Sequence, residues 1–165
     1  LGFNELPRET ALLYIHLNKT DHFKKTVTLI DRLNLEHKID LDTTNFILQK
    51  RAELVTDTIN AQTAAHDVES AQKTISSVID LIVHRCKLGY GDQDPKIITN
   101  CGILEERAIK IDVGRFYHDN RMKNPLFYKP ELFHLTRPFR KWLMQHHPEL
   151  VSHLDTEVQN VIFHD

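Results

Sequence analysis

The chain has 165 residues, of which 41% are hydrophobic and 27% charged, and these proportions are ordinary for one globular domain with its own core. Its formal net charge of -2 excludes the strong positive field that draws proteins to nucleic acids or anionic membranes. No apolar run approaches the roughly 20 residues of a membrane-spanning helix, and the scarcity of glycine, proline and aromatic residues favours helices over a β-sandwich or barrel.

The first third of the chain is predicted to hold one short element and two helices. Residues 10–18, TALLYIHLN, are apolar without a clear period, which fits either a buried strand or a short helix. Thr20 or Asp21 is placed to cap a first helix, and Asp42 or Thr43 a second. At helical spacing after these caps come Phe23, Val27, Ile30 and Leu33, and then Ile47, Leu54, Val55 and Ile59.

Residues 63–87 carry the strongest helical pattern of the chain. One apolar stripe runs at steps of three and four residues through Val68, Ile75, Val78, Ile79, Ile82 and Cys86. Acidic residues near the start and basic residues near the end suit the helix dipole. Gly89 is placed to end the helix.

The second half is predicted to contain one β-hairpin followed by two helices. The apolar runs at 96–99 and 108–111 flank a turn-like region that includes Gly102, which is typical of a two-stranded element. A polar loop then leads to helices at about 136–146 and from Glu149 onward. We therefore expect a mainly α fold with one small β-hairpin.

The two cysteines, Cys86 and Cys101, form no CxxC pair and favour a reducing compartment. The first residues, LGFNELPRET, lack the basic-then-apolar pattern of a secretory signal. We therefore expect a cytoplasmic protein with no transmembrane segment and no nucleic-acid partner. The first residue is not Met, which we interpret as a sign that residues 1–165 are a single helical domain of a longer chain.

Residues 88–116, LGYGDQDPKIITNCGILEERAIKIDVGRF, gather oxygen-bearing side chains around the predicted hairpin. A hairpin brings its two ends together, so Asp92, Asp94, Asn100 and Asp112 could converge on one point. Carboxylates and a carboxamide are hard oxygen ligands that suit Mg²⁺ or Mn²⁺. The plainer alternative is that these residues only form turns and caps, as aspartate usually does.

The order of these residues resembles the catalytic loop and metal-binding turn of the protein-kinase-like superfamily, closest to its lipid-kinase and small-molecule phosphotransferase branches. The matching positions are Gly89, Gly91, Asp92, Asp94 and Asn100, followed by Ile111, Asp112 and Gly114. The resemblance implies the C-terminal, large lobe of that fold, without the N-terminal β lobe. A long buried helix leading into the loop also fits it.

The resemblance implies phosphotransfer from ATP to a hydroxyl acceptor, a reaction that needs positioning and charge neutralisation. Asp92 matches the base, and Asn100 and Asp112 match the residues that hold Mg²⁺ or Mn²⁺ on the phosphates. Asp94 is a further candidate metal ligand, and Arg115 a candidate contact to a phosphate of the nucleotide.

Several departures from the pattern favour a degenerate, pseudokinase-like remnant that binds nucleotide or Mg²⁺. Asn100 follows Asp92 by eight residues instead of about five. Val113 stands where Phe is usual, and no glycine-rich phosphate loop or strand lysine precedes residue 68. We therefore expect no activity from this chain alone. The alternative function is a non-catalytic helical module that binds a protein partner.

Overall fold

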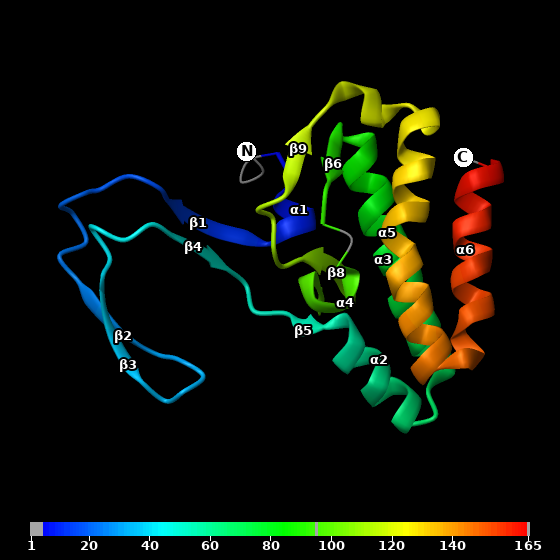
Figure 1. The fold of residues 1–165 in the computed structure, drawn as a ribbon, viewed down its shortest axis with the longest axis horizontal. Helices are drawn as coiled ribbons and strands as arrows, with labels where there is room; N and C mark the ends of the chain where they lie inside the picture. The colour runs from blue at the N-terminus through cyan, green and yellow to red at the C-terminus, as the bar shows by residue number, and fades with distance from the viewer. Residues whose placement is uncertain (1–4, 95, 165) are drawn as a thin grey trace.

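The structure of the chain is a computed structural model that describes residues 5–94 and 96–164. Helices contain 51% of the residues and strands 22%, and the described strands form four small sheets of two or three strands each. Figure 1 shows a β ribbon projecting to one side of a body in which the long helices pack together. The prediction of a mainly α fold with one small hairpin is therefore wrong, and the fold is mixed α and β.

The ribbon consists of residues 11–50 and contains two antiparallel ladders. A single short turn of helix, α1 (Pro7–Thr10), precedes it. Its strands are β1 (Leu12–His16), β2 (Thr26–Ile30), β3 (Glu36–Asp40) and β4 (Phe46–Gln49). Strand β1 pairs with β4, and β2 pairs with β3 further out along the ribbon. The apolar run at 10–18 thus contains a strand, as one of the two alternatives had it. The run is not buried as expected, since Leu13 in the strand and Leu17 just after it are 49% and 62% exposed.

The helix expected after Thr20 is a strand instead. Val27 and Leu29 also alternate with Thr26 and Thr28, a period of two that is equally present in the sequence. β-Branched residues favour strands, and Asp31 stabilises a reversal by accepting hydrogen bonds from two backbone N–H groups of the turn. The helix expected after Asp42 is also wrong over its first half, because β4 occupies residues 46–49.

The body begins with β5 (Glu53–Leu54) and α2 (Val55–Ala64), followed by α3 (Val68–Lys87). Helix α3 confirms the periodic pattern, and its predicted apolar stripe is buried apart from the exposed Val68. The predicted start at residue 63 is wrong, because α2 ends at Ala64 and α3 begins at Val68. Asp67 caps it by accepting a hydrogen bond from the Ser70 N–H at 3.0 Å. Gly89 follows its end with φ of +90°, a conformation that favours glycine.

Helix α3 leads directly into β6 (Tyr90–Asp92), which pairs with β9 (Phe116–His118). Between these strands lie α4 (Ile97–Asn100) and a hairpin of β7 (Cys101–Leu104) and β8 (Arg107–Lys110), with β5 on the outer side of β7. The predicted hairpin exists, but the run at 96–99 belongs mainly to α4 and the first strand starts at Cys101.

The C-terminal part forms one face of the core. It contains two short 3₁₀ turns and two helices: η1 (Asn120–Lys123), α5 (Pro125–His146), η2 (Pro148–Leu150) and α6 (Val151–His164). Figure 1 shows α5 lying along α3 with α6 beside it, and buried leucines and Phe139 fill the space between these helices. No helix among the described residues is long and apolar enough to cross a membrane.

Candidate functional site

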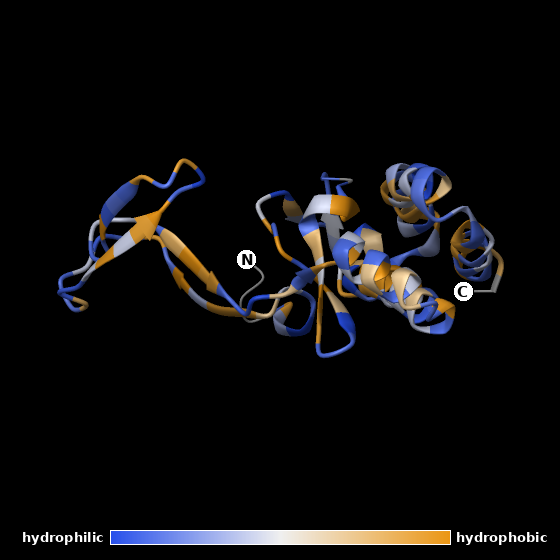
Figure 2. Ribbon diagram, turned by 90° about the horizontal axis from the view of Figure 1, so that it is seen from below, coloured by the Kyte–Doolittle hydropathy of each residue, from blue (hydrophilic) through white to orange (hydrophobic). Residues whose placement is uncertain are grey.

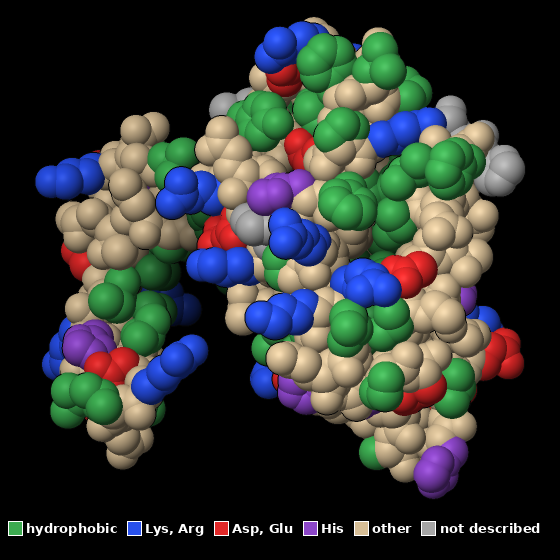
Figure 3. All heavy atoms as spheres, turned by 45° about the vertical axis from the view of Figure 1, so that its right-hand side comes forward, with side chains coloured by type: hydrophobic (Ala, Val, Ile, Leu, Met, Phe, Trp, Pro, Cys, Tyr) green, Lys and Arg blue, Asp and Glu red, His purple; other side chains and the backbone are tan. Residues whose placement is uncertain are grey.

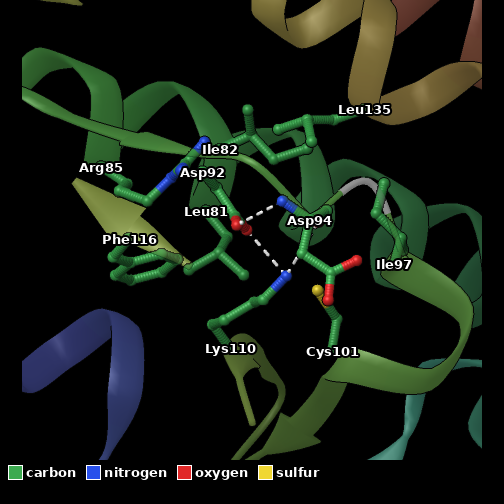
Figure 4. Close-up of a pocket in the computed structure, with 10 residues that line it drawn as sticks. All are labelled: Leu81, Ile82, Arg85, Asp92, Asp94, Ile97, Cys101, Lys110, Phe116 and Leu135. Carbon is green, nitrogen blue, oxygen red and sulfur yellow. Dashed lines mark hydrogen bonds and ion pairs between the residues drawn. The ribbon is translucent and has the colours of Figure 1, made fainter. Parts of the chain in front are cut away.

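Asp92, the predicted base, lies at the end of β6 and is buried. Its Oδ2 is 2.7 Å from Lys110 Nζ, and the two side chains are only 4% and 5% exposed (Figure 4). Its Oδ1 accepts a hydrogen bond from the Asp94 N–H at 2.9 Å. The carboxylate is therefore engaged on both oxygens by groups of the protein itself.

A second buried ion pair lies next to the first. Arg85 of α3 donates from Nη2 to Glu131 Oε1 of α5 at 2.5 Å. The same Oε1 accepts from the Asp92 N–H at 3.1 Å, and Tyr117 donates its hydroxyl to Oε2 at 3.2 Å. The two ion pairs are thus linked through Asp92, and together they join α3, α5 and three strands.

Asp94 and Asn100 lie together, as the sequence predicted. Asn100 Nδ2 donates to Asp94 Oδ2 at 2.7 Å, and Asp94 Oδ1 accepts from the Lys96 N–H at 3.2 Å. Lys110 Nζ also donates to the Asp94 backbone carbonyl at 3.2 Å. We call Asp92, Asp94, Asn100 and Lys110 the acidic cluster.

Asp112 is exposed and is not hydrogen-bonded to the acidic cluster in the described part of the chain. Its Oδ1 accepts from the Gly114 N–H at 2.9 Å, which closes the local turn between β8 and β9. Arg115 is exposed as well, and its backbone carbonyl accepts from the Gln93 N–H at 3.2 Å. Within residues 5–94 and 96–164, no three His, Cys, Asp or Glu side chains are grouped as a metal site.

A small cavity opens beside the acidic cluster. It has a volume of about 20 Å³ and is lined by charged and apolar residues that include Arg85, Asp92, Lys110, Cys101 and Phe116 (Figure 4). This is the size of one water molecule, and far smaller than the several hundred Å³ of a typical cofactor pocket. Arg85 Nη1 is buried and has no hydrogen-bond partner among the described residues, although the guanidinium lies 5.2 Å from the Phe116 ring centroid.

Both cysteines are buried beside this network, as predicted for Cys86 from its place on the apolar stripe. Burial raises the pKa of the Cys86 thiol to about 12 and that of Cys101 to about 11. Both side chains are therefore thiols at neutral pH. A thiol is a poor nucleophile and a poor metal ligand, so neither cysteine is suited to catalysis.

Three charged residues of this region were missed by sequence reasoning: Lys110, Arg85 and Glu131. Lys110 lies between Ile109 and Ile111 at the end of β8, and this apolar flanking is a weak signal of burial. Arg85 follows Ile82 by three residues and so lies on the buried stripe of α3. Glu131 could not be found this way, because helix α5 was expected to begin at about residue 136.

Comparison with known proteins gives no indication of function, so the function has to be inferred from the geometry of the structure. No model of a protein family, no curated protein and no solved structure matches the chain. The relation to the protein-kinase-like superfamily therefore stays a prediction that rests on about residues 68–116.

Proposed function

We propose that this protein is a non-catalytic binding module whose ribbon docks onto a partner. The observation that carries the proposal is that both faces of the ribbon expose large apolar side chains. Neighbouring residues of a strand point to opposite faces. In β4 the neighbours Ile47 and Leu48 are 51% and 52% exposed, so each face of that ladder exposes a large apolar side chain.

The exposed apolar surface extends along the whole ribbon. Its large hydrophobic residues that are exposed are Leu13, Tyr14, Leu17, Leu29, Ile30, Leu33, Leu35, Ile47 and Leu48. Figure 2 shows hydrophobic residues along both ladders, and Figure 3 shows the ribbon standing apart from the body with hydrophobic side chains on its surface. Large exposed apolar side chains gathered on one segment in this way are typical of an interaction site.

The ribbon is held in shape by a small number of contacts. Ring contacts at 5.0 to 6.0 Å join Tyr14, His16, Phe23 and Phe46 on one face. Asp42 accepts from the Thr20 hydroxyl and from two backbone N–H groups. Two-stranded ribbons are marginal in water unless something packs on them, so a partner would stabilise this segment substantially.

The contacts of the acidic cluster favour a structural role for it. A general base must be free to take a proton from its substrate. Asp92 already faces Lys110, and Asn100 already donates to Asp94. Gln49, at the end of β4, donates from Nε2 to the Lys110 carbonyl at 2.8 Å, so the same cluster anchors the base of the ribbon to the body.

The proposal is tested by placing a photo-crosslinking amino acid on the ribbon in the cells that make the protein. Leu33, 78% exposed at the ribbon tip, is the test position, and Leu126, 79% exposed at the start of α5, is the matched control. We expect discrete adducts from position 33 and none from position 126. Equal labelling at both positions, or none at position 33, would contradict a binding role for the ribbon.

Phosphotransfer from ATP to a hydroxyl acceptor, or a remnant that binds nucleotide with Mg²⁺ or Mn²⁺, is the second candidate. Its support is the pairing of β6 with β9, which brackets the Asp112 turn, together with the exposed Asp112 carboxylate. Ligand at 100 times its dissociation constant adds roughly 2.7 kcal/mol to stability. If this candidate is right, Mg²⁺ with ATP raises the melting temperature of the wild type but not of Asp112→Asn.

A further inference from the structure

Strand β2 has one edge that no described strand covers, because its sheet contains only β2 and β3. The Leu41 N–H donates to the Lys25 carbonyl and the Asp31 N–H to the Leu35 carbonyl, each at 3.0 Å. In an antiparallel ladder, residues whose backbone N–H and C=O groups point toward the paired strand alternate with residues whose groups point away from it. Lys25 and Asp31 are of the first kind, and so are Val27 and Leu29 between them. The backbone N–H and C=O groups of Thr26, Thr28 and Ile30 therefore point away from β3.

We propose that this edge pairs with the same edge of a second copy of the chain, as one form of the ribbon docking proposed above. The two β2 strands run antiparallel about Thr28 and build one sheet in the order β3, β2, β2 of the second copy, β3 of the second copy. Such a contact is isologous and closes as a twofold dimer. It converts two marginal two-stranded ladders into one four-stranded sheet.

The backbone of β2 fits this register. With Thr28 opposite Thr28 of the second copy, Thr26 lies opposite Ile30. All three are residues whose N–H and C=O groups face the open edge, so each pair can exchange two hydrogen bonds. A register shifted by one residue would place Val27 or Leu29 opposite Thr28. The backbone N–H and C=O groups of Val27 and Leu29 face β3, so these pairs could not exchange hydrogen bonds.

The side chains of β2 are also self-complementary in this register. Val27 lies opposite Leu29 of the second copy, in the pairs without backbone hydrogen bonds, where side chains approach most closely. Just outside the strand, Lys25 lies opposite Asp31. The His37 ring, within 2.9 Å of Asp31 Oδ2, lowers the pKa of that carboxyl, which keeps it charged at neutral pH. The like charges of Lys24 and Arg32 lie one residue further out, where solvent and salt screen them.

The edges of β3 and β1 are less suited to this pairing. Strand β2, TVTLI, carries no charge and is rich in β-branched residues, whereas β3 carries Glu36, Lys38 and Asp40. Charged residues on an edge oppose strand addition. Strand β1 contains an irregularity between Leu12 and Tyr14, which interrupts the row of edge groups.

The test is the mass of the protein in solution, measured by sedimentation velocity over a range of concentrations. We expect a reversible dimer of twice 19.3 kDa. Thr28→Pro removes the central N–H donor of each copy but is compatible with an edge strand. It should raise the dimer dissociation constant at least about tenfold. Thr28→Val, which keeps the N–H, is the matched control and should leave the dimer intact.

The register is tested by two further variants. Val27→Lys and Leu29→Glu should each weaken the dimer, and mixing them should restore it, because the ammonium introduced in one chain then faces the carboxylate introduced in the other. A monomer at all concentrations, a dimer insensitive to Thr28→Pro, or no rescue on mixing would overturn the proposal. A monomer whose position 33 still crosslinks to another polypeptide would overturn the second copy as the partner while leaving the binding role of the ribbon standing.

Discussion

Lys110 and Asp92 form an ion pair inside the protein, with Nζ and Oδ2 2.7 Å apart. The pair joins β8 to β6, and the Asp92 N–H extends the link to Glu131 on α5. The aspartate that a reading of the motif assigns to proton transfer is therefore part of a buried charge network that holds three elements together.

Replacing Lys110 with Met should destabilise the fold by about 3–5 kcal/mol, because it leaves the Asp92 carboxylate buried without its counter-charge. Urea denaturation of the two proteins measures the difference. Lys73→Met is the control, since Lys73 pairs with Glu69 on an exposed helix face and its loss should change the stability far less. Equal losses from the two variants would show that the Lys110 pair is not structural.

Ile79→Ala should cost about 2–5 kcal/mol, because it opens a cavity in the core between α3 and its neighbours. Ile79 is 2% exposed, whereas Val68 on the same helix is 42% exposed. Val68→Ala should therefore change the free energy of unfolding by less than about 0.5 kcal/mol. A loss under about 1 kcal/mol at Ile79 would mean that the buried face of α3 is placed wrongly.

The ribbon should loosen in acid through Asp42. The Thr20 hydroxyl and, more weakly, the Phe23 and Lys24 N–H groups lower the pKa of Asp42 in the folded protein. A depressed pKa means that the carboxylate contributes stability above its unfolded pKa of about 3.9, and that this contribution is lost as the pH falls through the folded value. Carbon-13 NMR titration of the carboxyl measures this pKa. Thr20→Val should raise it, and an unchanged titration would contradict the assignment.

Cys86 and Cys101 should resist a thiol reagent at pH 7.5 in the native protein and react rapidly in urea. Their pKa values of about 12 and about 11 leave almost no thiolate, and burial blocks access. The measurement is the rate of labelling by an aromatic disulfide with and without denaturant. Fast labelling of the native protein would show that the region around the acidic cluster opens readily.

The candidate site could be predicted from the sequence only in part. The contact between Asp94 and Asn100 was expected, because the predicted hairpin was to bring these side chains together. The convergence of Asp112 with them stays unsupported, since its carboxylate instead closes its own turn. Nothing in the sequence near either residue indicated that Lys110 would form an ion pair with Asp92.

Local patterns were sufficient for the buried stripe of α3 and for its end at Gly89, because each depends on residues within a few positions along the chain. They did not predict its start, since the helix was expected from residue 63 and begins at Val68. They failed for residues 20–33, where apolar spacing fits a helix and a strand alike and only pairing with β3 decides between them. The charge network was decided by tertiary structure alone. Arg85 and Glu131 are 46 residues apart, and a buried charge is tolerated only when the fold brings its partner to it.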